Sequence, residues 1–171
     1  MPTTQIMMLW SFARAKVHEI GRFDDEGSVV ETVIITAIFA ALALAVGAII
    51  VSPSGEIIAR GNNQVLRNCD PTAHAEIIAL REAGRALNNY RLLGCTLYAT
   101  LEPCAMCAGA LLHARIARLV YATPDPKAGA CGSVLDVMNH PALNHRMEVL
   151  EGVCGNECAT MLTSFFRARR T

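Results

Sequence analysis

The chain has 171 residues, of which 53% are hydrophobic, and its 15 basic and 15 acidic side chains give a formal net charge of zero. This length suits one domain whose core needs no disulfides, and a second domain is not expected. Zero net charge excludes a global field that attracts nucleic acid, so any such binding needs a local basic patch, which the C-terminus offers. Seven cysteines without a cleavable signal pattern favour a reducing compartment, so we expect a cytoplasmic protein.

The start of the chain is an uncertain extension, residues 1–28, and residues 29–171 are predicted to form a single domain. Residues 33–51 are apolar apart from Thr36 and Gly47, which meets the length rule for a membrane span. Residues 46–51 and 56–59, separated by Ser-Pro-Ser-Gly, are more typical of two strands and a turn. The remaining residues, 32–45, would rise about 21 Å as a helix, short of a hydrocarbon core of roughly 30 Å. We therefore expect a buried helix and no membrane segment, with the span as the alternative.

Beyond this hairpin, helical and strand patterns alternate. Helical spacing covers residues 72–88, 104–114 and 156–169, and short strand patterns cover 96–100, 119–122 and 147–150. Residues 123–130 have the composition of a loop. Strands that alternate with helices predict an α/β fold in which one sheet carries helices on both faces.

Two short stretches, Pro-Thr-Ala-His-Ala-Glu at 71–76 and Glu-Pro-Cys-Ala-Met-Cys at 102–107, carry the chemistry. One imidazole and two thiolates at this spacing make three zinc ligands and leave the fourth tetrahedral position for water, as catalytic zinc sites do. The predicted ligands are His74, Cys104 and Cys107. If a helix begins near the first cysteine, both cysteines share one face and the helix dipole favours their thiolates. Glu76 then need not be a ligand and can move protons instead.

Two other uses of these residues stay open. A structural zinc would need a fourth protein ligand, and no other cysteine repeats the short ligand spacing well. The candidates for that ligand are Cys69, Cys95, Cys131, Cys154 and Cys158. A disulfide or redox pair of Cys104 and Cys107 would leave His74 and Glu76 unexplained. We therefore predict one catalytic zinc ion per chain.

The His-x-Glu and Pro-Cys-x-x-Cys pair is the signature of zinc nucleobase deaminases. With Asp-Pro-Thr-Ala-His-Ala-Glu-Ile at 70–77, Asn-Tyr-Arg-Leu at 89–92 and Asn-His-Arg at 144–146, the chain closely resembles bacterial tRNA-specific adenosine deaminases. The resemblance implies a homodimer that acts on a tRNA anticodon stem-loop and hydrolytically deaminates the wobble adenosine to inosine. It also implies a cytidine deaminase-like fold, a three-layer α/β/α arrangement around a central mixed five-stranded sheet. Residues 29–171 would then be a zinc-dependent deaminase domain.

The resemblance also assigns roles residue by residue. Asn63 matches the asparagine that hydrogen-bonds the target base, the backbone N–H of Ala75 assists it, and Glu76 matches the proton shuttle. Asp125 and Lys127 fall in the loop that lies along the anticodon nucleotides.

The C-terminal helix matches the RNA-facing helix of the family, and an aromatic pair beside arginines suits splayed single-stranded bases. Its candidate contacts are Phe165, Phe166, Arg167, Arg169 and Arg170. Either phenylalanine could equally dock this helix on the core. Asn144 and His145 are further candidates for substrate contact, and they could equally brace a turn.

Two other functions stay open. A deaminase of free guanine or cytosine shares the zinc signature, but it has no need of a basic aromatic tail. A non-catalytic RNA-binding subunit with a structural zinc has no use for Glu76. The chain departs from the family at residues 38–45, which are apolar where the family has a polar amphipathic helix.

Overall fold

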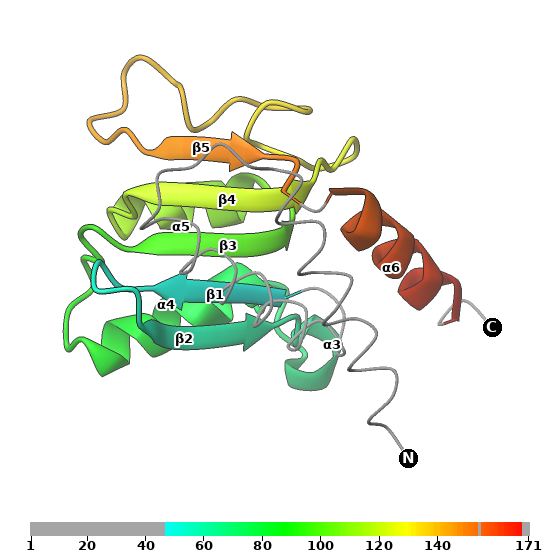
Figure 1. Cartoon of the computed structure of the whole chain (residues 1–171), viewed down its shortest axis with the longest axis horizontal. Helices are drawn as coiled ribbons and strands as arrows, with labels where there is room; N and C mark the ends of the chain where they lie inside the picture. Colours follow the sequence, from blue (N-terminus) through cyan, green and yellow to red (C-terminus); the bar gives the residue numbers. More distant parts are fainter. Residues whose placement is uncertain (1–46, 154, 169–171) are drawn as a thin grey trace. The chain divides into compact units, whose positions relative to one another are not determined.

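The computed structural model describes residues 47–153 and 155–168, which form a mixed five-stranded sheet with helices packed against it (Figure 1). The strands lie in the order β2-β1-β3-β4-β5. In chain order the elements are β1 Gly47–Val51, β2 Ile57–Asn62, α3 Val65–Asn68, α4 Ala75–Ala86, β3 Thr96–Leu101, α5 Ala105–His113, β4 Arg118–Thr123, β5 Glu148–Glu151 and α6 Gly155–Ala168.

The first two strands form the predicted hairpin. β1 and β2 pair antiparallel, and the N–H of Ser52 donates to the carbonyl of Glu56 at 2.9 Å across the turn. Gly55 in this turn has a φ of 83°, which glycine adopts without steric cost. The strand, turn and strand pattern is confirmed. The predicted helix at 32–45, its membrane alternative and the extension at 1–28 lie outside the described residues, and no helix within the described part is long and apolar enough to cross a membrane.

β2, β3 and β4 run in the same direction, so their carboxyl ends meet at one edge of the sheet. β1 is antiparallel to both β2 and β3, and β4 pairs with β3 in parallel, with Leu101 opposite Thr123. α5 begins shortly after β3 ends, and α4 follows β2 with the short helix α3 between them. This edge therefore brings together the two halves of the predicted zinc signature.

Helices α4 and α5 cover one face of the sheet (Figure 1). α4 packs on β1 and β2, and its buried alanines, Ala75, Ala79 and Ala83, let the helix come close to the strands. Gly61 of β2 lies directly under the first turns of this helix, because a Cβ there would overlap the carbonyl oxygen of Ala75 and lie 2.8 Å from the nitrogen of Ala79. Direct backbone contact thus fixes the start of α4 against the sheet.

Side chains on the other face of the sheet are buried as well, among them Tyr98 and Val120, which alternate with Leu97 and Leu119 of the first face. α6 contacts β4, and Cys158 and Leu162 of this helix are buried. The predicted α/β fold is therefore confirmed, with each described element within a few residues of its predicted bounds. The exception is α3, which the sequence does not predict because its four residues show no apolar period; it ends at Cys69 with a φ of 49°.

Candidate active site

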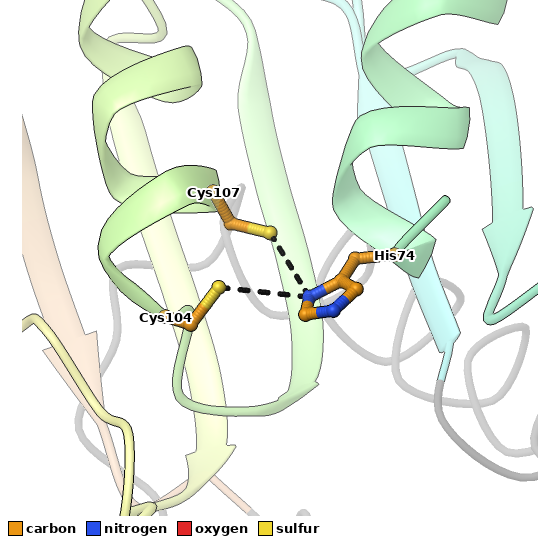
Figure 2. A group of neighbouring side chains, drawn as sticks. All are labelled: His74, Cys104 and Cys107. Atoms are coloured by element: carbon orange, nitrogen blue, oxygen red, sulfur yellow. Dashed lines mark hydrogen bonds between the residues drawn. The ribbon is translucent and has the colours of Figure 1, made fainter. Parts of the chain in front are cut away.

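Three side chains converge where α4 and α5 begin. His74 and Cys104 are the residues that precede the two helices, both with extended backbone, and Cys107 lies in the first turn of α5. Figure 2 shows Nδ1 of His74 facing both sulfur atoms, at 3.5 Å from Cys104 Sγ and 3.6 Å from Cys107 Sγ. Zn–N and Zn–S bonds of about 2.05 and 2.3 Å in a tetrahedral site place N and S about 3.6 Å apart. The donor set and its spacing fit a zinc ion.

A fourth protein ligand is not found in the described part of the chain. His74, Cys104 and Cys107 are the only group there whose ligand atoms gather, all within 4.8 Å of one another. Cys95, Cys131 and Cys158 are buried apart from this group and Cys69 is exposed, while Cys154 lies outside the described residues. None of the described cysteines therefore completes a closed structural zinc site.

The two thiols differ in acidity. The neighbouring Cys107 side chain, backbone N–H groups at the start of α5 and the charge of His74 lower the pKa of Cys104 to about 5 against the cost of burial. The side chain of Cys104, then burial and the charge of Glu76, raise the pKa of Cys107. Cys104 is therefore the more readily ionised of the two, and a bound cation would favour the thiolate of Cys107 as well.

Glu76 lies beside this group without belonging to it. It is in the first turn of α4, is 5% exposed, and its Oε2 accepts a hydrogen bond from Cys107 Sγ at 3.6 Å. Burial raises the pKa of this carboxyl, and hydrogen bonding to its own backbone and the charge of His74 oppose that rise. A carboxyl group held next to the ligands, with its proton affinity increased, is suited to carry protons. Ala75 is the first residue of α4, so its N–H has no hydrogen-bond acceptor within the helix.

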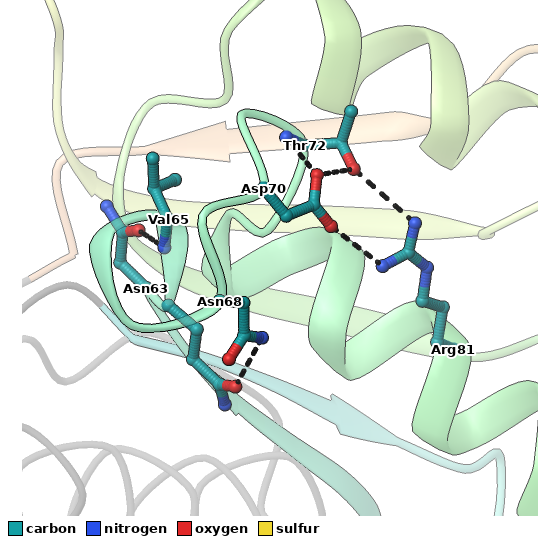
Figure 3. Close-up of polar contacts among 7 residues, drawn as sticks. Asn63, Val65, Asn68, Asp70, Thr72 and Arg81 are labelled. Atoms are coloured by element: carbon teal, nitrogen blue, oxygen red, sulfur yellow. Dashed lines mark hydrogen bonds and ion pairs between the residues drawn. The ribbon is translucent and has the colours of Figure 1, made fainter.

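Asn63 directly follows β2, and a backbone hydrogen bond joins the residue after it to the residue before His74. The Oδ1 atom of Asn63 accepts the N–H of Val65 at 3.1 Å, which helps to start α3 (Figure 3). The next residue, Gln64, donates its N–H to the carbonyl of Ala73 at 2.9 Å. The structure therefore brings the predicted base-binding residue and the imidazole ligand to the same edge of the sheet.

Asp70 braces the loop that leads to His74. Its Oδ1 accepts the N–H and the hydroxyl of Thr72 at 2.8 and 2.7 Å, and Arg81 lies 3.7 Å from its other oxygen (Figure 3). The hydrogen bonds from Thr72 hold the pKa of Asp70 below its ordinary value. The carboxylate thus stabilises the turn before the imidazole.

The Pro-Asp-Pro-Lys loop follows β4 at the same edge. The Oδ1 atom of Asp125 accepts the N–H of Lys127 at 2.9 Å, and the Lys127 side chain is exposed. The N–H of Asp125 donates to Glu102, a buried residue for which the sequence patterns predict no role. The signal that could have revealed Glu102 is a charged residue placed directly between an apolar strand and a zinc-ligand motif.

The whole arrangement matches a known family. The model of the cytidine and deoxycytidylate deaminase zinc-binding region matches residues 31–123. A tRNA-specific adenosine deaminase from Haemophilus influenzae is 51% identical over 125 residues, which are 73% of this chain and 72% of that protein. The chain belongs to the tRNA-specific adenosine deaminase family.

Solved structures agree with this family membership. A chain from a study of A-to-I editing by tRNA:A34 deaminases at the wobble position has a TM-score of 0.68 and 40% identity, over 74% of this chain and 99% of that one. A guanine deaminase from Nitrosomonas europaea has a TM-score of 0.59 at 21% identity, over 96% of this chain and 84% of that one. The second likeness shows the fold alone.

Two of the predicted substrate contacts lie at the opposite edge of the sheet, before β4 begins. His145 Nε2 donates to the carbonyl of Ile116 at 2.7 Å, and Arg115 donates to Oδ1 of Asn144 at 3.0 Å. These bonds hold the segment before β5 against the residues that precede β4. This is the structural role that the sequence leaves open as the alternative to substrate contact. Substrate contact by Asn144 and His145 stays a prediction of the family resemblance.

The aromatic pair of this family member lies in the last turns of α6. The rings of Phe165 and Phe166 meet edge to face, 5.4 Å apart, and Phe166 is 44% exposed whereas Phe165 is partly buried. Arg167 beside them is exposed. The pair therefore divides into one inner and one outer ring, while Arg169 and Arg170 lie outside the described residues.

Proposed function

We propose that this protein is a zinc-dependent hydrolase that converts the adenosine at the wobble position of a tRNA anticodon to inosine and ammonia. The observation that carries the proposal is the open ligand group with a buried glutamate beside it, in a chain that is 51% identical over 125 residues to a tRNA-specific adenosine deaminase. His74, Cys104 and Cys107 would hold one zinc ion per chain, and the bound ion would supply Lewis acidity that makes a water molecule nucleophilic near neutral pH.

The residues around the ligands have separate tasks in this mechanism. Oε2 of Glu76 takes one proton from the attacking water and passes it to the ring nitrogen. It then takes the second proton from the new hydroxyl group on the ring carbon and passes it to the departing amino group, which leaves as ammonia. Asn63 hydrogen-bonds the edge of the base, and the N–H of Ala75 orients its ring at the start of α4. Because a stacked base cannot reach the ligand group, the substrate base is taken from a loop, where unstacking costs least.

The direct test presents possible substrates in parallel. An anticodon stem-loop with a wobble adenosine, a free nucleobase and a free nucleoside are incubated with the protein, and the mass of each is followed. We expect conversion of the stem-loop alone. Conversion of free guanine or cytosine alone would support the free-base alternative, and conversion of none of them would support the non-catalytic RNA-binding alternative.

We also propose that the protein acts as a homodimer through α5. Residues 108–112 of this helix are small and apolar, as a surface covered by a partner could be, but Ala108, Leu111 and Leu112 are buried in the chain's own core. One stripe of the same helix remains outward, with Met106 36% exposed and no atom near a Cβ placed on Gly109. Sedimentation at micromolar concentration is expected to show a dimer, and a monomer would contradict the proposal. A cytoplasmic location remains the prediction made from the sequence.

A further inference from the structure

Glu102 is a buried carboxylate that the proposed chemistry does not use. It follows β3, precedes the zinc-ligating Cys104 by two residues and is 2% exposed. A buried carboxylate is costly unless hydrogen bonds replace the water that it has given up. The partners of Glu102 therefore indicate what its position achieves.

Those partners all belong to one loop. Oε1 of Glu102 accepts the backbone N–H groups of Cys131 at 2.8 Å and Ser133 at 3.2 Å. Oε2 accepts the N–H of Asp125 at 2.9 Å and also the hydroxyl of Ser133. Both ends of the loop, residues 125–133, are thus tied to a single side chain, which charge-assisted hydrogen bonds hold firmly.

The backbone of the ligand segment joins the same loop. Cys104 pairs with Gly129 in an antiparallel bridge, and the N–H of Ala130 donates to the carbonyl of Pro103 at 2.9 Å. A Cβ on Gly129 would overlap the Glu102 carboxylate and lie 2.6 Å from the carbonyl oxygen of Asp125. The loop therefore wraps closely around the carboxylate and leaves no room for a side chain at residue 129.

We propose that Glu102 is a positioning residue, which holds the loop of residues 125–133 in place beside Cys104 and thereby presents Asp125 and Lys127 to the RNA. The part about RNA rests on the proposed function. The other two ligands, His74 and Cys107, are placed by the starts of α4 and α5. Removal of the carboxylate should therefore loosen RNA binding and leave the zinc ion bound.

The test uses Glu102→Gln in the zinc-loaded full chain. This change removes the negative charge and replaces one accepting oxygen by an NH2 group, which cannot accept a hydrogen bond from the N–H groups of the loop. Exchange of the backbone amides at Cys131 and Ser133 should become about ten-fold faster or more, since their hydrogen bonds to a charged group are removed. The KM for an anticodon stem-loop should rise about ten-fold, while zinc content stays at one per chain and kcat per zinc changes less than about three-fold.

Two further variants make the test specific. Ser133→Ala removes one donor and keeps the carboxylate, so it should shift the same quantities in the same direction by a smaller factor. Glu148→Gln makes the same chemical change in an exposed ion pair with Arg118 at 2.8 Å, and it should shift none of them. If Glu102→Gln fails to fold, the Ser133→Ala data decide the question.

Unchanged exchange at Cys131 and Ser133 would overturn the proposal, as would faster exchange with an unchanged KM. Zinc loss in proportion to activity would also overturn it, because Glu102 would then serve the ligands. If the unmodified protein does not convert the stem-loop, the proposed function fails, and the exchange measurements still decide whether Glu102 holds the loop.

Discussion

Gly61→Ala is predicted to disable the site by displacing the start of α4, although the substitution itself changes no residue that carries chemistry. Gly61 faces the first turns of α4, and a Cβ there would overlap the carbonyl oxygen of Ala75 and lie 2.8 Å from the nitrogen of Ala79. These neighbours are backbone atoms of a helix and cannot rotate away. The strand and the start of α4, which carries Glu76, must move apart by about 1 Å.

The size of the effect follows from this displacement. Forcing a methyl group into a filled space costs about 1–3 kcal/mol, and the lower entropy of the unfolded chain with alanine offsets about 0.4–1 kcal/mol of it. The net cost is at most about 2.6 kcal/mol, and in a chain of this length each kcal/mol changes Tm by about 2–4 °C, so Tm should fall by up to about 10 °C. A shift of about 1 Å between reacting groups costs about 100-fold in rate, so kcat per zinc should fall by that factor.

The assay measures Tm, zinc content and turnover of the stem-loop for Gly61→Ala beside a matched control. Gly84→Ala makes the same change within α4, where the new Cβ would lie 3.5 Å from the carbonyl oxygen of Asn89, an ordinary contact. The control should keep its turnover and gain about 0.5–1 kcal/mol from helix propensity. Wild-type Tm and turnover in Gly61→Ala would refute the argument from close contact.

Three other variants test the remaining assignments. Glu76→Ala should keep one zinc per chain by metal analysis and abolish turnover; release of the metal would make Glu76 a ligand. Phe166→Ala should weaken stem-loop binding by about 1–3 kcal/mol and leave Tm unchanged, because its ring is exposed for stacking. Phe165→Ala should instead lower Tm. If Phe165→Ala weakened binding and Phe166→Ala lowered Tm, the two roles would be the other way round. Neutralising the three C-terminal arginines should reduce the slope of log binding constant against log salt concentration. The expected reduction is about 0.7 for each phosphate that one of these arginines contacts, and an unchanged slope would mean that the RNA binds elsewhere.

The sequence determined the features that depend on short spacing. His74, Cys104 and Cys107 are recognisable because one imidazole and two closely spaced thiols can hold zinc and leave a fourth position open. The start of α5 is local information as well, because it lies directly beside the two cysteines. The hairpin of β1 and β2 was predictable for the same reason, since a turn sequence between two apolar runs is local information.

Strand order and register decided the rest. Asn144 and His145 lie within a motif typical of the family, yet the parallel pairing of β3 and β4 puts their contacts at the edge opposite the ligands. Likewise, only the packing of α5 on the sheet shows that Leu111 faces the chain's own core. A sequence pattern indicates the faces of a helix, but it does not identify the neighbour that each face meets.

Gly61 and Glu102 illustrate the same limit at the site itself. Nothing near Gly61 in the sequence signals that a helix backbone lies against it, and the donors to Glu102 come from residues 23 to 31 positions away. Residue types and spacing determine which atoms can bind a metal ion. Long-range contacts decide which distant backbone groups hold those atoms in place. The free energy of these contacts depends on how whole strands and helices pack together, which short spacing does not reveal.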